Sequence, residues 1–185
     1  MKALFTAAVA GLAGVTAMMP AEAGTYSAGN SMARDCWEAA VGRDYDRNAF
    51  YHCNMALDEE GLDAQNRAAT LVNRGVLYMR NNNHTAARRD FDRAIATDSR
   101  NGEAWLNMAI SRLRQNESAA ALPMIEKALA LNTKEQALAY YSRAIVYERA
   151  GNLRGAYADL QRARDLAPNW KEPAEDLKRY SVRRR

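Results

Sequence analysis

The sequence predicts an all-α protein built from a repeated pair of helices. Of its 185 residues, 48% are hydrophobic, 26% are charged and only four are prolines, a composition typical of a folded helical domain. No run alternates β-branched and polar residues as a half-buried strand would. Residues 71–99, 105–133 and 140–168 align with one another at a spacing of about 34, the length of a helix–turn–helix repeat. We name these segments the first, middle and third units.

Residues 1–23 have the pattern of a signal peptide. Lys2 supplies the positive start, residues 3–19 are apolar, and the small residues Ala21 and Ala23 precede the predicted cut. The segment is rich in alanine and glycine and lacks a polybasic flank, so a cleaved signal is favoured over a lasting membrane span. We therefore predict a periplasmic or secreted mature chain that has no stable membrane span after signal cleavage.

The next part of the chain, after a predicted flexible linker at residues 24–30, is expected to form a helix pair over residues 31–64. This pair contains the only two cysteines, Cys36 and Cys53, which are separated by 17 positions. Facing helices can bring two cysteines within bonding distance, and an oxidising compartment keeps such a bond formed. A disulfide closing a loop of this length would stabilise the fold by about 3 kcal/mol.

Two other readings of the cysteines remain open at this point. One is a catalytic thiol, and the other is a Cys/His metal site that uses the neighbouring His52. No CxxC or HxxxH pattern is present, and the only other histidine is His84, so a structural disulfide is favoured. The prediction is no metal and no cofactor. A net charge of +4 is too small to indicate a polyanionic partner, and no nucleic acid is expected.

Small and large residues recur at fixed places in the three units. The small residues stand where paired helices must approach closely, and the large ones stand between them and are expected to fill the core. The small residues are Gly75, Ala109 and Ala144 in the first helices, and Ala87, Ala121, Ala156, Ala94, Ala128 and Ala163 in the second helices; the large ones are Phe91, Ile125 and Leu160.

This pattern resembles the tetratricopeptide repeat. In the third unit the family's spaced signature is met by Tyr140, Ala144, Tyr147, Ala156, Leu160, Ala163 and Pro168. The first unit departs from it at Ser99, and the middle unit has Arg112 in place of an aromatic residue and Pro123 inside its second helix, where a kink or a late start is expected. The resemblance implies a right-handed α-solenoid of three helix pairs over residues 65–168.

Both ends of the chain are expected to close this stack. Residues 31–64 form a degenerate helix pair, and residues 169–185 form a capping helix followed by a basic tail. The cap is predicted from Trp170, Ala174, Leu177 and Tyr180, which would share one helical face. The tail, Arg183–Arg185, is either solvated or bound to an anionic surface.

Two positions change together from unit to unit. Opposite charges occupy them in the first and third units, whereas two apolar residues occupy them in the middle unit, which predicts contact across each helix pair. The residues are Arg74 with Asp90, Arg143 with Asp159, and Met108 with Met124. These arginines are therefore interpreted as structural.

A second set of arginines, Arg80, Arg114 and Arg149, recurs in the last turn of each first helix. They either stabilise exposed helix-end carbonyls or contact a ligand, and the sequence leaves both possibilities open. The resemblance places them beside a concave groove that binds partners. Its floor would include Val76, Leu106, Ile110, Tyr141 and Ile145, and also Asn73 and Asn107, which stand where related peptide-binding repeats use asparagine.

These features predict a noncatalytic protein–protein interaction scaffold in the cell envelope that binds a partner peptide or helix in the concave groove. The lysines that complete the family's carboxylate clamp have no counterpart, so recognition of a free C-terminus is not expected. The alternative is an electrostatic binder of an anionic polymer or membrane surface, using the repeated arginines and the basic tail. An enzyme is not predicted, because no nucleophile, base and orienting group can be assembled.

Overall fold

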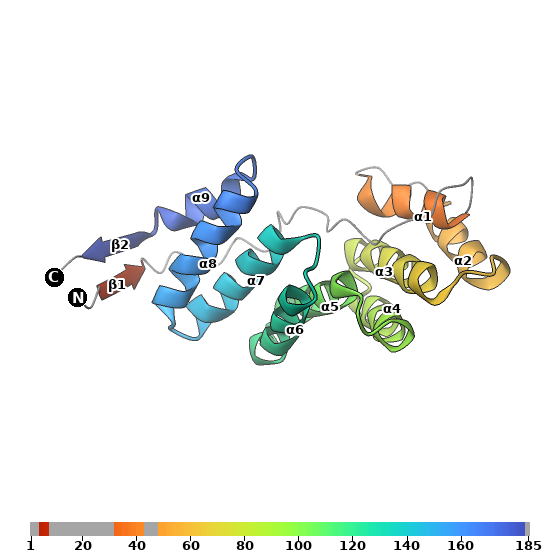
Figure 1. The fold of residues 1–185 in the computed structure, drawn as a ribbon, viewed down its shortest axis with the longest axis horizontal. Coiled ribbons are helices and arrows are strands. Elements are labelled where there is room, and N and C mark those ends of the chain that lie inside the picture. The colour runs from red at the N-terminus through yellow and green to blue at the C-terminus, as the bar shows by residue number, and fades with distance from the viewer. Residues whose placement is uncertain (1–3, 8–31, 43–47, 184–185) are drawn as a thin grey trace.

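The computed structural model describes residues 4–7, 32–42 and 48–183, and it confirms an all-α solenoid of stacked helix pairs (Figure 1). The predicted cleavage point and the linker at residues 24–30 lie outside the described residues. Within the described ranges, no helix is both long enough and apolar enough to cross a membrane.

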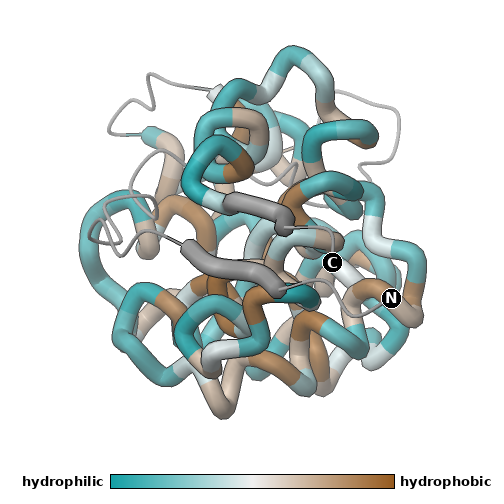
Figure 2. Tube along the Cα trace, turned by 90° about the vertical axis from the view of Figure 1, so that its left-hand side faces the viewer, coloured by the Kyte–Doolittle hydropathy of each residue, from teal (hydrophilic) through white to brown (hydrophobic). Residues whose placement is uncertain are grey.

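The helices follow one another as antiparallel pairs along the stack. The pairs are α1 (Met32–Val41) with α2 (Ala49–Glu59), α3 (Ala64–Arg80) with α4 (His84–Thr97), α5 (Gly102–Arg114) with α6 (Ser118–Ala130), and α7 (Gln136–Arg149) with α8 (Leu153–Leu166). A short helix, α9 (Lys171–Leu177), follows α8. Hydrophobic stretches lie mainly inside the stack and hydrophilic stretches at its outer turns (Figure 2).

The turn inside each unit is set by one residue with a left-handed backbone. Asn82, Asn116 and Gly151 have φ values of 57°, 62° and 75°, and they stand at equivalent places. Glycine and asparagine adopt this conformation more easily than other residues, which explains why the three turns read NNN, QNE and AGN. Each turn reverses the chain so that the second helix packs against the first.

Close helix packing in the first unit depends on Gly75. A Cβ atom at this position would lie 2.4 Å from Cε1 of Phe91, closer than side-chain atoms can approach. The third unit has Ala144 and the smaller Leu160 at the equivalent places, and all of these apolar side chains are buried. The small and large residues identified in the sequence therefore compensate for each other in the core.

The proline in the middle unit does not delay the second helix. α6 begins at Ser118, which is equivalent to His84, the first residue of α4, and it continues through Pro123 to Ala130. The predicted late start is wrong, because Pro123 lies in the second turn of the helix and removes only one donor there.

The N-terminal helix pair is joined by a disulfide between Cys36 and Cys53, whose Cα atoms are 4.7 Å apart. Both cysteines are fully buried. The N-terminal end of α1 is also held: the Glu60 carboxylate accepts hydrogen bonds from the backbone N–H groups of Met32 (2.6 Å) and Ala33 (3.3 Å). α1 is therefore fixed both by the disulfide and at its first turn.

The C-terminal end differs from the predicted cap. α9 ends at Leu177, and Tyr180 begins a short strand, β2 (Tyr180–Arg183), which pairs antiparallel with β1 (Leu4–Ala7). The two ends of the chain consequently lie side by side (Figure 1). The prediction of one helical face from Trp170 through Tyr180 is wrong, because a turn after α9 redirects the chain and lets Arg179 pair with Glu148 on α7.

Candidate functional site

The predicted groove floor lies on α3, α5 and α7, which stack next to one another in chain order. Every predicted floor residue is buried, with at most 5% of its surface exposed: Asn73, Val76, Leu106, Asn107, Ile110, Tyr141 and Ile145. The apolar members join the main hydrophobic core. The sequence left open whether this floor is exposed, and in the structure these side chains are covered.

The two floor asparagines differ in their hydrogen bonding. Asn107 Nδ2 donates to the Glu103 carbonyl oxygen of its own helix at 2.9 Å. Asn73 Oδ1 and the Ser142 hydroxyl, one on α3 and one on α7, are buried without a hydrogen-bond partner in the described part of the chain. Buried polar atoms are rarely left unpaired, so these two oxygens mark places where the packing of the described residues leaves a hydrogen bond unmade.

Two of the three repeated arginines hold neighbouring helix pairs together. Arg80 Nη1 donates to the Gly42 carbonyl oxygen at 2.7 Å, just beyond the C-terminal end of α1. Arg149 Nη1 donates to the Ser118 hydroxyl at 2.8 Å and to the Leu113 carbonyl oxygen at 3.5 Å. These arginines therefore stabilise the end of the preceding pair's first helix, whereas the sequence had suggested the end of their own.

Arg114, the middle member of this set, behaves differently. Its side chain is exposed, and it makes no hydrogen bond or ion pair with any described residue. The surrounding chain nevertheless desolvates the guanidinium enough to lower its pKa. Among the described residues, Arg114 thus has no anionic partner, whereas Arg80 and Arg149 both form hydrogen bonds.

The other arginines form the predicted contacts across the helix pairs. Arg74 donates to both carboxylate oxygens of Asp90 at 2.7 and 2.8 Å, and Arg143 does the same to Asp159 at 2.7 and 2.9 Å. Burial opposes the charge of Arg74, but its bonds to Asp90 raise its pKa. Both ion pairs are confirmed, and these arginines are structural.

The C-terminal segment, residues 170–180, packs over the face of α7 that carries Tyr141 and Glu148. The Tyr141 hydroxyl donates to Asp176 Oδ2 at 2.7 Å, and the Tyr141 and Trp170 ring centroids are 4.8 Å apart. Arg179 donates to both carboxylate oxygens of Glu148, at 2.6 and 3.1 Å. Burial and the bond to Asp176 raise the pKa of Tyr141. These contacts account for the burial of Tyr141. They were not predicted from the sequence, because they join residues about 30 positions apart and do not follow the repeat pattern.

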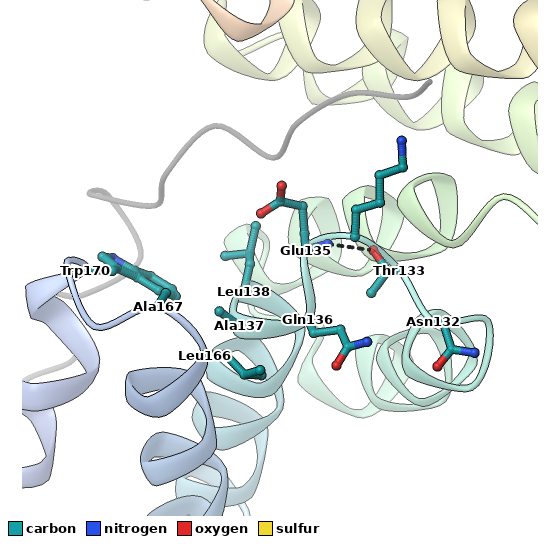
Figure 3. A pocket seen from close by; sticks show the side chains of 10 residues that line it. Asn132, Thr133, Glu135, Gln136, Ala137, Leu138, Leu166, Ala167 and Trp170 are labelled. Atoms are coloured by element: carbon teal, nitrogen blue, oxygen red, sulfur yellow. Dashed lines mark hydrogen bonds between the residues drawn. The ribbon is translucent and has the colours of Figure 1, made fainter. Parts of the chain in front are cut away.

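A pocket of about 450 Å³ lies at the opposite end of α7 from Arg149 (Figure 3). It lies between the turn that precedes α7 and the turn that follows α8, with Lys134 and Leu166 among its lining residues. The Glu135 N–H donates to the Thr133 hydroxyl at 3.3 Å on one wall. The lining combines these two turns with the adjoining ends of α7 and α8, and the repeat pattern marks none of these residues as a site, so the pocket was not predicted from the sequence.

Metal and thiol chemistry find no support in the described ranges. Both cysteines there are in the disulfide, and no group of three or more His, Cys, Asp or Glu side chains is placed to hold a metal ion.

Comparison with known proteins agrees with this geometry. A family model described as tetratricopeptide repeat matches residues 72–110 and 106–169, more than half of the chain. The chain belongs to the tetratricopeptide repeat family. Domains of this family are protein-interaction scaffolds and are generally noncatalytic. No curated protein matches the chain.

Two solved structures show the same fold. The first domain of this type in human RPAP3 has 24% sequence identity and a TM-score of 0.55, and the match covers 60% of this chain and 87% of that one. The first such domain of Spaghetti (RPAP3), bound to the HSP90 peptide SRMEEVD, also has 24% identity, with a TM-score of 0.57 and coverage of 64% and 93%.

Proposed function

We propose that this chain is an exported, noncatalytic scaffold of the cell envelope that binds a partner peptide or helix along the concave side of its three units. Membership of the tetratricopeptide repeat family supports a role in protein binding. The signal-like residues 1–23 and the disulfide between Cys36 and Cys53 support an oxidising compartment outside the cytoplasm.

The observation that carries the proposal is Arg114. Arg80 and Arg149 use their guanidinium groups to join neighbouring helix pairs, but Arg114 has no such contact with the described chain. A partly desolvated guanidinium binds carboxylates through strong, paired hydrogen bonds. An acidic side chain of a partner would satisfy Arg114, so we infer that the partner segment is acidic at this position.

The peptide-bound neighbour is consistent with such a ligand. The peptide named in that structure, SRMEEVD, contains three acidic residues. This chain lacks the lysines of the family's carboxylate clamp, so we propose that Arg114 contacts an acidic side chain within the partner.

Partner capture with charge-reversal variants tests the role of Arg114. The full chain is used to capture proteins from the exported fraction, and bound proteins are identified by mass spectrometry. Arg114→Glu is expected to abolish capture of a specific partner and to lower the melting temperature only slightly, because the new carboxylate faces the C-terminal end of α5. Arg100→Glu is the matched control, because the Arg100 side chain is 90% exposed and the charge change is the same.

Three outcomes can be separated. Loss of capture in Arg114→Glu alone supports the groove. Equal weakening by both variants, reproduced by added salt, would favour the alternative of an anionic polymer or membrane surface as the ligand. Unchanged capture in both variants would show that Arg114 does not bind the partner.

Cell fractionation tests the proposed location. Expression from the natural start should yield an exported protein that lacks residues 1–23 and has no free thiol, with a mass about 2 Da below its reduced form because disulfide formation removes two hydrogens. A cytoplasmic chain with two titratable thiols would contradict this part of the proposal.

A further inference from the structure

The concave side of α7 presents a two-turn stripe of side chains at Tyr141, Ile145 and Glu148. Their spacing of four and three residues places them on one face of the helix. Tyr141 and Ile145 are 1% and 5% exposed, and the Glu148 side chain is 16% exposed. This stripe, which would form the third unit's part of a binding groove, is therefore already covered.

The covering groups match the stripe in chemistry as well as in position. The Asp176 carboxylate accepts from the Tyr141 hydroxyl at 2.7 Å, and the Arg179 guanidinium donates to the Glu148 carboxylate at 2.6 Å. Asp176 and Arg179 are one helical turn apart and also lie 3.3 Å from each other. The Trp170 ring packs on Tyr141. One face of α7 thus binds an acidic, a basic and an aromatic side chain of the same segment.

The segment that supplies these groups packs on α8 and adds Trp170 and Tyr180 to the core, but its helix is short. α9 has only seven residues and no side-chain hydrogen bond at its N-terminus, and isolated helices of this length are unstable. Trp170 Nε1 and Arg179 Nε are buried without hydrogen-bond partners among the described residues. Each unpaired donor costs free energy, so this docked state is less favourable than its contacts alone suggest. Such a segment can open locally while the solenoid stays folded.

We propose that residues 170–180, which we name the C-terminal clasp, act as an internal ligand that closes the third unit's end of the groove and regulates access to it. A partner that reaches this end must displace the clasp, and it does so by presenting the same chemistry: an acidic residue with a basic residue three positions later on a helical turn, preceded by an aromatic side chain. This proposal depends on the proposed function in one respect: it assumes that a natural partner binds the groove.

The test uses a fluorescently labelled synthetic peptide of residues 169–180 as the probe, added to the full chain. The clasp of the unaltered protein competes at the high effective concentration of a tethered group, so weak binding is expected. Asp176→Ala with Arg179→Ala weakens the clasp and leaves α7 intact, and it should increase probe affinity by at least about tenfold. Adding Glu148→Gln and Tyr141→Phe to that variant should abolish the gain.

A matched control is available on the same helix. Glu175 and Lys178 form an ion pair whose side chains are 63% and 69% exposed, so it does not cover α7. Glu175→Ala with Lys178→Ala removes the same two charges and should leave probe binding at the level of the unaltered protein. An equal gain in the control, or no gain in the clasp variant when circular dichroism shows it folded, would overturn the proposal.

Hydrogen exchange of the unaltered chain gives a second, independent measurement. Amides of α9 should exchange through local opening, faster than the amides of α7 and with little sensitivity to low denaturant. Exchange of α9 only through global unfolding would contradict a displaceable clasp. Neither measurement needs a natural partner, so their failure would leave the role of Arg114 standing, and failure of partner capture would leave the clasp standing.

Discussion

The middle unit and its two neighbours reach the same helix-pair geometry with different chemistry. The first and third units join their helices with Arg74–Asp90 and Arg143–Asp159, whereas the middle unit has Met108 and Met124 at these places. Met108 is buried, and Met124 packs against the same core. The ion pairs are therefore not what defines the fold; the small and large residues shared by all three units define it.

This difference shows that the two positions are exchangeable as a pair but not singly. Asp90 is almost fully buried and its side chain is 3% exposed, so its charge depends on the two hydrogen bonds that Arg74 donates to it and on Arg93, whose Nη1 lies 3.7 Å from Asp90 Oδ1. A buried ion pair and a well-packed apolar pair can have similar stability, because the attraction of the charges is offset by their loss of solvation.

The largest expected effect follows from breaking one pair. Arg74→Met or Asp90→Met alone should lower the free energy of unfolding by about 3–5 kcal/mol, since each removes the paired hydrogen bonds of a buried charge. Arg74→Met should lie at the lower end, because Asp90 keeps its 3.7 Å contact with Arg93. The double variant copies the middle unit and should recover most of this loss. About 1 kcal/mol should remain, because Arg74 Nη1 also donates to Asn54 Oδ1 at 2.7 Å.

Urea denaturation of the two single variants and the double variant measures the coupling. A loss in the double variant equal to the sum of the single losses would mean that the two residues do not stabilise each other, in conflict with the observed contact.

The second prediction concerns helix packing. Gly75→Ala should cost about 1–3 kcal/mol, because its Cβ would overlap the Phe91 ring, and this exceeds the gain of about 1 kcal/mol from helix propensity. Gly75→Ala combined with Phe91→Leu copies the third unit and should be more stable than Gly75→Ala alone. Thermal melts of the three proteins check this, and a stabilising Gly75→Ala would contradict the packing argument.

Much of the fold could be predicted because the repeat supplies its own comparison. Three copies in one chain show which positions must be small. The joint change from Arg74 and Asp90 to two methionines indicates from the sequence alone that these positions are in contact. The end of α9 was not predictable in this way. Trp170 and Tyr180 fit a helical spacing, but Arg179 finds Glu148 on another helix, and that tertiary contact overrides the local pattern.

The candidate site was harder to predict for a related physical reason. Whether Leu106 or Tyr141 is exposed depends on what packs above it, and periodicity indicates only which face of a helix it shares. The contacts of Arg80 and Arg149 were also hidden, because they include backbone carbonyl oxygens of the preceding helix pair. Every residue has such a carbonyl, so no sequence pattern marks it.

The third prediction compares the turns. Gly151→Ala should cost about 1 kcal/mol, because alanine is strained at a φ of 75° and no atom lies within 4 Å of the added Cβ to compensate. Asn116→Gly should be neutral or slightly stabilising, because glycine adopts the same conformation without strain. Urea midpoints measure both, and a neutral Gly151→Ala would show that this turn can relax.

The smallest effect on stability is expected at Arg114, and it separates the middle unit from its neighbours most sharply. Arg80→Ala removes the 2.7 Å hydrogen bond to the Gly42 carbonyl oxygen and should cost about 1 kcal/mol or more. Arg114→Ala removes no hydrogen bond or ion pair within the described chain and should change the urea midpoint by less than the equivalent of about 0.5 kcal/mol. If Arg114→Ala is as destabilising as Arg80→Ala, then Arg114 supports the fold like the other two, and the middle unit offers no free cation to a partner. A stable Arg114→Ala protein that also loses partner capture would instead assign this arginine to binding. The middle unit would then differ from its neighbours in using its repeated arginine to bind a partner.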